Sequence, residues 1–475
     1  MKKLPSIDND FAQWYQEVVH GAELADNAPV RGMMIIRPYG YRMWELMKER
    51  LDHRIKATGH ENASFPLLIP ESYIKREKEH VEGFSPELAI VTYAGGKELA
   101  EPLVVRPTSE TIVHSMFARW ITSWRDLPLK INQWANVVRW EMRPRVFLRT
   151  TEFWWQEGHT AHATYDEAHE HVRLMLEEYR AFAEDYLAIP VITGKKTNHE
   201  KFPGAEITYT FEAIMQDGKA LQMGTSHLLA QTFAHAFEMS YQDQTGAKAY
   251  PYLTSWGTTT RLIGAVIMMH GDQKGLILPP MIAPIQLVII PILTSNEAEN
   301  QKIMAKVHTV AAMLKMFRVH IDQGSDKSPG SKFYHWEFKG VPLRIEMGTR
   351  DLAHNSVVVV DRLNGAKKSV PIETITSYAA DMLAWFHREL FDRAQQKIAQ
   401  IIQQTDQTIE TFGPLLEKNN IVYQVGWCGG LDCEKSTKEY KGSIRCILSS
   451  EMKAQQRCFS CQAPSNVEVL IAKSY

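Results

Sequence analysis

The stretch FLRTTEFWWQEGHTAHAT, residues 147–164, decides how this chain folds. Its centre, residues 150–160, is rich in Thr, Phe and Trp and predicts a strand. Residues 131–140, INQWANVVRW, predict a second strand, and the short basic loop MRPRVFLR joins the two. Because side chains alternate across a strand, one face should carry charged and aromatic groups together. These groups are Arg139 and Glu141 from the first strand, and Arg149, Thr151, Phe153, Trp155, Glu157 and His159 from the second.

This predicted face has two interpretations, a charged outer face of an antiparallel sheet or a binding surface. Arg, Glu, His and aromatic residues together are unusual both in a core and on a plain surface. An arginine held on a strand forms a rigid fork for phosphate oxygens. The sequence has no GxxxxGK[ST] loop and no GxGxxG after a strand, so a bound nucleotide would need another scaffold.

A second motif, TSWGTTTRLIGAVIMMHGD at residues 254–272, predicts a helix that begins near Arg261. Gly257 and Gly264 permit close approach of the backbone. A helix start favours anions, and an added arginine favours a polyphosphate. The alternative is a helix with a face of small packing residues.

The third motif is RPTSE, residues 106–110. Thr108 could cap the helix that follows Pro107, and Glu110 could complement the helix dipole. The functional alternative is a hydroxyl and a carboxylate that bind the ammonium group of a substrate.

Composition limits the protein class. The chain has 475 residues, 44% of them hydrophobic and 23% charged, which suggests about three domains of a globular protein. Its most apolar run, residues 281–293, is interrupted by Pro284, Gln286 and Pro291 and is shorter than the roughly 20 residues of a spanning helix. The start, MKKLPSIDND, lacks the apolar core of a signal peptide and predicts a cytoplasmic protein. A net charge of −2 argues against a general DNA binder, although residues 281–400 carry +3.

Four of the five cysteines form two close pairs near the C-terminus. Four residues separate Cys428 from Cys433, and two separate Cys458 from Cys461. In a reducing compartment this favours a metal over disulfides, and the spacing suits a closed Cys₄ zinc site. The alternative is a set of reduced core thiols. Cys446 lies between the pairs and is expected in a loop as a buried free thiol.

Together these motifs resemble those of class II aminoacyl-tRNA synthetases. A helix predicted from Pro38 to Thr58, followed by SFPLLIP at residues 64–70, resembles motif 1. VVRWE and FLRTTEF resemble motif 2, and Arg261 in TTTRLIGA resembles the motif 3 arginine. With RPTSE, ALQMGTSHLLAQTFA and the closing SY, the chain resembles the prolyl-tRNA synthetase family of class IIa, in its archaeal and eukaryotic type, over nearly its whole length.

The resemblance implies a ligase that joins L-proline to ATP as prolyl-adenylate and then charges tRNA(Pro), with Mg²⁺ accompanying the ATP. Arg139 and Arg261 would be catalytic, because charge develops on the reacting phosphorus. The implied proline-binding residues are Thr108, Glu110, Arg139, Trp155, Glu157, His159, His227, Ser255 and Gly257. The implied ATP-binding residues are Arg139, Glu141, Arg149, Thr150, Gln222, Thr225, Thr259 and Arg261. Glu212 and Gln222, on adjacent predicted strands, could reach the Mg²⁺.

The resemblance also implies an α/β multidomain fold. A class II antiparallel sheet with helices would occupy residues 1–280, an α/β anticodon-binding domain with a connector helix 281–400, and a small zinc-binding domain 401–475. Arg344, Glu346 and Arg350 alternate on a predicted extended segment and could reach anticodon bases, or could lie on a solvated strand face. Motif 1 implies a homodimer. Only about a hundred residues separate motifs 2 and 3, so no editing domain is expected.

Two alternatives remain at this point. One is another class IIa enzyme, such as a threonyl- or glycyl-tRNA synthetase, although the threonyl enzyme uses an active-site zinc and all five cysteines here lie near the C-terminus. The other is a paralogue that binds tRNA or a partner without chemistry. Such proteins tend to lose the phosphate-binding arginines, which this sequence keeps at Arg139, Arg149 and Arg261.

Overall fold

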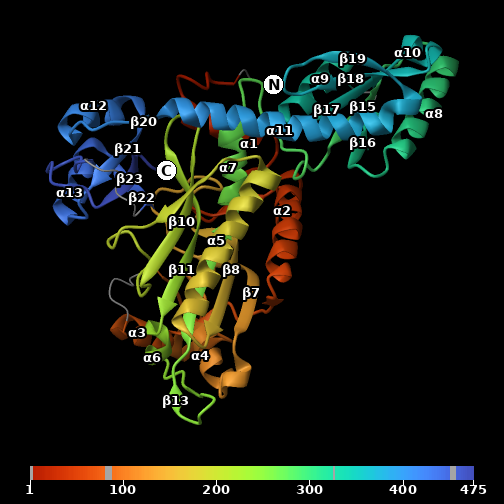
Figure 1. Cartoon of the computed structure of the whole chain (residues 1–475). Coiled ribbons are helices and arrows are strands. Elements are labelled where there is room, and N and C mark those ends of the chain that lie inside the picture. The colour runs from red at the N-terminus through yellow and green to blue at the C-terminus, as the bar shows by residue number, and fades with distance from the viewer. Residues whose placement is uncertain (1–3, 81–87, 325–326, 450–455) are drawn as a thin grey trace.

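The computed structural model describes residues 4–80, 88–324, 327–449 and 456–475 (Figure 1). Its largest element is one sheet with the strand order β20-β21-β23-β22-β9-β10-β11-β14-β8-β7-β3. The strands from the first 280 residues are β3 (Glu61–Asn62), β7 (Leu129–Val138), β8 (Glu152–His162), β9 (Ile192–Lys195), β10 (Ile207–Ile214), β11 (Ala220–Ala230) and β14 (Tyr252–Thr259). From β9 to β7 all neighbouring strands are antiparallel, which confirms the predicted sheet.

Helices cover this sheet and form the largest core. They are α1 (Phe11–Gly21), α2 (Pro38–Ala57), α5 (Tyr165–Leu187) and α7 (Arg261–His270). Trp14, Val18, Trp44 and Leu51 recur at helical spacing and are buried, as the pattern predicts. Gly59, with φ of 87°, follows α2 in the left-handed region that glycine adopts most readily.

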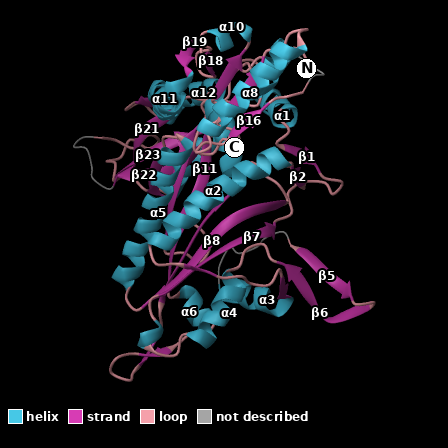
Figure 2. Ribbon diagram, turned by 90° about the vertical axis from the view of Figure 1, so that its right-hand side faces the viewer, coloured by secondary structure: helices cyan, strands magenta, loops and turns pink. Residues whose placement is uncertain are grey.

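Smaller elements surround this core. A three-stranded sheet of β4 (Leu68–Pro70), β6 (Lys97–Val105) and β5 (Ala89–Ala94) projects from one side, as Figure 2 shows. Beside it lie α3 (Glu71–His80), α4 (Glu110–Trp120) and α6 (Thr232–Ala236). Two further ribbons are β1 (Ala25–Asn27) with β2 (Met34–Ile36), and β12 (Tyr241–Gln242) with β13 (Lys248–Ala249).

The next module, at the upper right of Figure 1, alternates strands and helices. Its sheet has the order β16-β15-β17-β18-β19, formed by β15 (Leu287–Pro291), β16 (Val319–Ile321), β17 (Leu343–Met347), β18 (Ser356–Asp361) and β19 (Lys367–Pro371). Its helices are α8 (Glu297–Met313), α9 (Pro329–Phe338) and α10 (Thr349–Ala353). Strand β15 pairs in parallel with β16 and β17, whereas β18 pairs antiparallel with β17 and β19.

The predicted connector helix is α11 (Ile375–Ile401), which crosses from this module to the C-terminal one (Figure 1). The C-terminal module holds α12 (Ile409–Asn419), α13 (Leu431–Ser436), β20 (Ile402–Gln404), β21 (Val422–Trp427), β22 (Ser443–Ser449) and β23 (Val467–Ala472). Because β22 pairs with β9, the strands of this module continue the large sheet. Among the described helices, none combines the length and apolarity needed to cross a membrane.

Cys446 corrects one expectation in this module. It lies within strand β22 and not in a loop, although its thiol is free and buried as predicted. The spacing between cysteines carries no information on the strand, which pairs with β23 of the same module and with the distant β9.

A buried histidine cluster should make the fold sensitive to acid. The Nε2 atoms of His60 and His171 lie 3.2 Å apart, and the ring of His162 lies 4.9 Å from that of His171. Burial lowers the pKa of His60 and of His162 to about 4 and that of His171 to about 2. The unfolded chain binds these protons near pH 6.5, so acidification from about 6.5 to 4 should favour unfolding.

Urea unfolding should therefore give a smaller free energy of unfolding at pH 5.0 than at pH 7.5, and His171→Leu should reduce this difference. An unchanged pH dependence in the variant would contradict this role.

Candidate active site

Strands β8, β11 and β14 form much of the wall of a cavity of about 440 Å³. Every residue predicted to bind proline or ATP lines this cavity: Thr108, Glu110, Arg139, Glu141, Arg149, Thr150, Trp155, Glu157, His159, Gln222, Thr225, His227, Ser255, Gly257, Thr259 and Arg261. Register explains much of this. Trp155, Glu157 and His159 alternate along β8 and lie opposite Thr259, Gly257 and Ser255 of β14.

The ends of the hairpin differ from the prediction. Strand β7 ends at Val138 and β8 begins at Glu152, so Arg139, Glu141, Arg149 and Thr151 lie in the connecting loop and not on the strand face. The ladder ends because Thr151 N–H donates to Gly32 O (2.7 Å), outside the hairpin. The alternation therefore holds only from Phe153 onward.

Arg139 is held at the mouth of this hairpin. Its Nε donates to Pro107 O (2.8 Å). Its guanidinium carbon lies 5.4 Å from the ring centre of Trp155 and 5.5 Å from that of Phe153. Burial lowers the pKa of Arg139, and the charges of Glu110 and Glu157 act in the opposite direction. The group is thus a fixed cation between two carboxylates.

Thr108 and Glu110 lie beside Arg139, and the capping alternative is wrong for Thr108. The N-cap of α4 is Ser109, without a side-chain capping bond. The Thr108 hydroxyl instead donates to the Glu110 carboxylate, and both side chains are buried. Because Glu110 begins α4, its carboxylate also lies at the positive end of the helix dipole.

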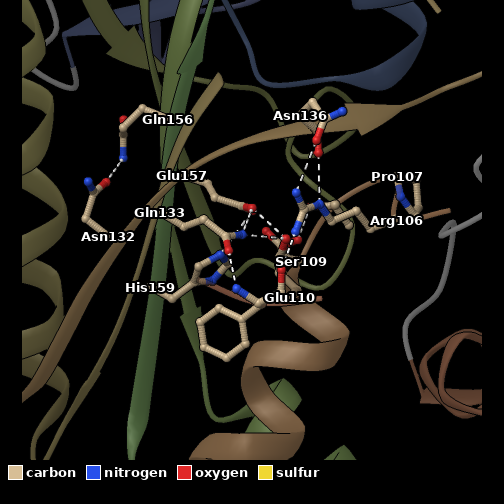
Figure 3. Close-up of polar contacts among 12 residues, drawn as sticks. Arg106, Pro107, Ser109, Glu110, Asn132, Gln133, Asn136, Gln156, Glu157 and His159 are labelled. Carbon is tan, nitrogen blue, oxygen red and sulfur yellow. Dashed lines mark hydrogen bonds and ion pairs between the residues drawn. The ribbon is translucent and has the colours of Figure 1, made fainter. Parts of the chain in front are cut away.

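Glu157 and His159, both in the cavity lining, form a buried ion pair (Figure 3). His159 Nε2 lies 3.2 Å from Glu157 Oε2. Burial alone would raise the pKa of Glu157. The hydrogen bond and charge of His159, with hydrogen bonds from Ser109 and Gln133, nevertheless hold that pKa below its usual value. Burial would lower the pKa of His159, but the Glu157 hydrogen bond and the charges of Glu110 and Glu157 raise it.

Arg261 begins α7, as predicted, at the other end of the cavity. Its Nε donates to Leu148 O (3.0 Å) and its Nη1 to Gln222 O (2.9 Å). Burial, followed by the charge of Arg149, lowers the pKa of Arg261 to about 10. Two carbonyls fix the guanidinium, and a polyanion would supply the countercharge.

Glu212 is neither a solvated strand residue nor an available metal ligand. It is fully buried opposite Gln222, as the predicted strand pair requires. Lys196 Nζ lies 2.8 Å from its Oε1, and the Arg445 guanidinium donates to its Oε2 (3.0 Å). Arg445 comes from β22, so this use of Glu212 depends on a contact that the local sequence does not encode.

One part of the cavity wall, the connection between β9 and β10, is not predicted by any pattern in the sequence. Lys196, Glu200, Lys201, Phe202 and Pro203 line it from the connection between β9 and β10. Phe202 packs 4.6 Å from the ring centre of His227. The connection has no periodicity that points to a site, and only the register of β9 with β10 brings it to the cavity.

His227 is neutral in this setting. Its Nδ1 lies 3.0 Å from the Thr208 hydroxyl and its Nε2 2.9 Å from that of Thr225. Burial lowers its pKa to about 3, and the charges of His159 and Arg139 act in the same direction. The ring therefore offers the cavity an uncharged polar wall.

The four paired cysteines meet in the C-terminal module. Cys428 Sγ lies 3.7 Å from that of Cys433 and 3.8 Å from that of Cys461. With Cys458, all four sulfur atoms lie within 4.8 Å of one another. Four thiols at this separation fit a tetrahedral zinc ion, because Zn–S bonds of about 2.3 Å put the sulfurs roughly 3.8 Å apart.

The proposed anticodon residues separate into two groups. Arg344 and Glu346 share a face of β17, with Arg344 Nη2 2.9 Å from Glu346 Oε1 and its guanidinium 4.3 Å from the ring centre of Phe333. Arg350 lies on the short helix α10 and not on an extended segment. The reason is that Asp351 Oδ2 accepts a hydrogen bond from Gly348 N–H (2.9 Å), which caps the start of a helix there.

Comparison with known proteins agrees with this architecture. The family model of the tRNA synthetase class II core domain (G, H, P, S and T) matches residues 93–270, and that of the anticodon binding domain matches residues 286–382. The model of the prolyl-tRNA synthetase C-terminal domain matches residues 409–475. The fold and the cavity therefore define a class II aminoacyl-tRNA synthetase.

The relatives narrow this class. The chain is 48% identical to proline--tRNA ligase of Borreliella burgdorferi strain ZS7, over 99% of each chain, and 48% identical to that of Chlorobaculum tepidum, over 100% and 99%. The chain belongs to the proline--tRNA ligase family, and not to the threonyl or glycyl families. A crystal structure of prolyl-tRNA synthetase from Cryptosporidium parvum, complexed with halofuginone and AMPPNP, matches with a TM-score of 0.94 and 41% identity, over 100% of this chain and 99% of that one.

Proposed function

We propose that the cavity binds L-proline and ATP, forms prolyl-adenylate with release of pyrophosphate, and transfers the prolyl group to the 3′ end of tRNA(Pro) in the cytoplasm. The observation that carries this is the position of Arg139, which lines the cavity with Glu110 and Arg149 and lies over the Trp155 ring. ATP–pyrophosphate exchange across the amino acids tests it. Proline should give the fastest exchange, and exchange without a preference for proline would contradict it.

The proline end of the cavity would use charge for the amine and shape for the ring. Thr108 and Glu110 would bind the ammonium group, since a buried carboxylate with a neighbouring hydroxyl suits two N–H donors. Trp155 offers an aromatic surface to the rigid pyrrolidine. The remaining wall would come from Glu157, His159, His227, Ser255 and Gly257.

The ATP end would neutralise phosphate charge. Arg139 would bridge the proline carboxylate and the α-phosphate, where negative charge develops in the transition state. Arg149 and Arg261 would hold the remaining phosphates, with Glu141, Thr150, Gln222, Thr225 and Thr259 around the nucleotide. Mg²⁺ would accompany the ATP, and the side-chain oxygens of Glu141 and Gln222 line the cavity and are of the type that Mg²⁺ takes.

The three modules would divide the work. We assign residues 1–280 to catalysis, 281–400 to anticodon binding and 401–475 to a zinc-supported module. Arg344 and Glu346 present paired hydrogen-bonding groups beside Phe333, a combination suited to base edges and base stacking. Arg350 would contact the tRNA from α10, where it is exposed.

Alanine should be activated and should not be removed in cis. A pocket shaped for proline loses only about 1–3 kcal/mol for each missing methylene, and alanine lacks two ring carbons, so discrimination against alanine should be imperfect. Residues 163–251, between β8 and β14, form α5, β9, β10, β11, α6, the β12–β13 ribbon and the connections between them. These elements belong to the sheet and its surroundings, so the segment contains no separate domain. Alanine-dependent pyrophosphate exchange should therefore be measurable, while alanyl-tRNA should persist when the enzyme is added. Rapid hydrolysis of alanyl-tRNA by the purified protein would contradict this.

The protein should be a homodimer in solution. Several exposed apolar side chains lie on the projecting sheet or beside it: Leu67, Leu68, Ile90, Tyr93 and Trp120. Motif 1, residues 38–70, ends at this sheet, and apolar groups left exposed there would be covered by a second copy of the chain. Light scattering at micromolar concentration should give twice the mass of one chain for the wild type. The Ile90→Glu variant should give the mass of a single chain. Met316→Glu replaces an exposed residue of another module and should leave the dimer intact. A wild-type monomer would contradict the proposal.

A further inference from the structure

Gln133 lies beside the proline end of the cavity without lining it. It is on β7 opposite Glu157, and only 1% of the residue is exposed. Its Nε2 donates to Glu157 Oε1 (2.8 Å) and to Ser109 Oγ (3.1 Å), as Figure 3 shows. Its Oε1 accepts from Phe65 N–H (2.6 Å). One carboxamide thus joins a cavity carboxylate to the segment that leads into β4.

These contacts determine the state of Glu157. Its Oε1 accepts from both Gln133 and Ser109 (2.5 Å), and its Oε2 faces the His159 ring nitrogen. A buried carboxyl group that faces three donors is favoured as a carboxylate, because each hydrogen bond stabilises the charged form. Without them, burial would favour the neutral acid.

The backbone of Phe65 links Gln133 to Arg106. Its N–H is held by Gln133, and its C=O accepts from Arg106 Nη1 (2.6 Å). Arg106 also donates to Asn136 O (2.8 Å), and it precedes Pro107, whose carbonyl holds Arg139. The carboxamide orientation of Gln133 is therefore fixed at both ends, with the N–H groups toward Glu157.

We propose that Gln133 is a positioning residue for the amino acid: it keeps Glu157 as a carboxylate in a fixed place, so that proline affinity depends on a side chain that never touches proline. This inference rests on the proposed function of the cavity. If Glu157 became neutral, Arg139 and His159 would be left in excess at the end that receives a cationic amine. Proline binding should weaken, while the ATP end keeps Arg149 and Arg261.

The test separates proline affinity from ATP affinity. Gln133→Met removes the donors at similar volume and should raise the proline KM roughly tenfold or more, since a hydrogen bond to a charged group contributes about 1.5–3 kcal/mol. The ATP KM should change less than about twofold. The Glu157 pKa should rise in this variant. As the pH is lowered, the proline KM of the variant should therefore begin to increase at a higher pH than the proline KM of the wild type.

Gln133→Glu supplies the opposite pH dependence. It keeps the shape and an acceptor for Phe65 N–H, but it places a second carboxyl group against Glu157. Two carboxylates in contact share a proton more readily as the pH falls. The proline KM of this variant should be worst at neutral pH and should improve on mild acidification.

Gln156→Met is the matched control. Gln156 is a fully buried glutamine on the neighbouring strand β8, bonded to Asn132 and Tyr179 on the face away from the cavity. It should lose stability without a change in proline KM. Equal effects of Gln133→Met and Gln156→Met on the proline KM, or a wild-type proline KM in Gln133→Met, would overturn the inference. A wild type that exchanges no pyrophosphate with proline would instead reject the proposed function.

Discussion

Replacing Arg139 by alanine should lower proline-dependent pyrophosphate exchange by about 10²–10³-fold, the effect of removing one donor aimed at developing transition-state charge. The structure explains why no neighbour can replace it. Arg139 lies close to the charges of Glu110 and Glu157, and its guanidinium is oriented by Pro107 O and the Trp155 ring. Arg149 is 54% exposed in its side chain, and the Arg261 guanidinium is bound to two carbonyls.

Two further variants show whether charge or geometry is responsible. Arg139→Lys keeps the cation but loses the planar fork, so exchange should fall less than in the alanine variant and remain below the wild type. Arg125→Ala removes an arginine that lies over Trp124 and does not line the cavity, and it should exchange at the wild-type rate. Unchanged exchange by Arg139→Ala in a folded protein would show that the assigned role is wrong.

Loss of the zinc site should give the largest change in stability. We expect elemental analysis of chelator-free protein to find one zinc per chain, held by Cys428, Cys433, Cys458 and Cys461. Cys458→Ser should abolish stoichiometric zinc and destabilise the C-terminal module by on the order of 4 kcal/mol, since metal loss belongs to the small group of strongly destabilising changes. Thermal unfolding of wild type and variant, with zinc content measured on both, checks this.

The control uses the fifth cysteine. Cys446→Ala removes a buried thiol of the same module outside the cluster, so the variant should keep its zinc and lose less stability. The zinc variant should also activate proline more weakly. Thr197 donates to Glu434 (2.6 Å), the residue after Cys433, and the adjacent Lys196 lines the cavity. A Cys458→Ser protein with full zinc and the wild-type melting temperature would refute the site.

Local patterns in the sequence predicted part of the cavity lining, and the family resemblance implied the other residues. Trp155, Glu157 and His159 share a face because strand side chains alternate every two residues, a property of the backbone alone. Arg261 begins a helix, and the cysteine pairs have metal-ligand spacing, both of which are short-range features. The longer motifs then identified the family, whose members match over nearly the whole chain.

Long-range contacts decided the rest. The end of β7 at Val138 depends on Gly32, the state of Glu212 on Arg445, and the orientation of Gln133 on Phe65 and Ser109. In each case the partner lies far away in the chain, so no spacing or periodicity near the residue encodes it. Strand pairing and packing bring such partners together only when the chain folds, because register between distant strands is a property of the whole sheet. The sequence alone therefore determined which residues share a strand face or a helix start, and the tertiary structure decided which groups hold them in place.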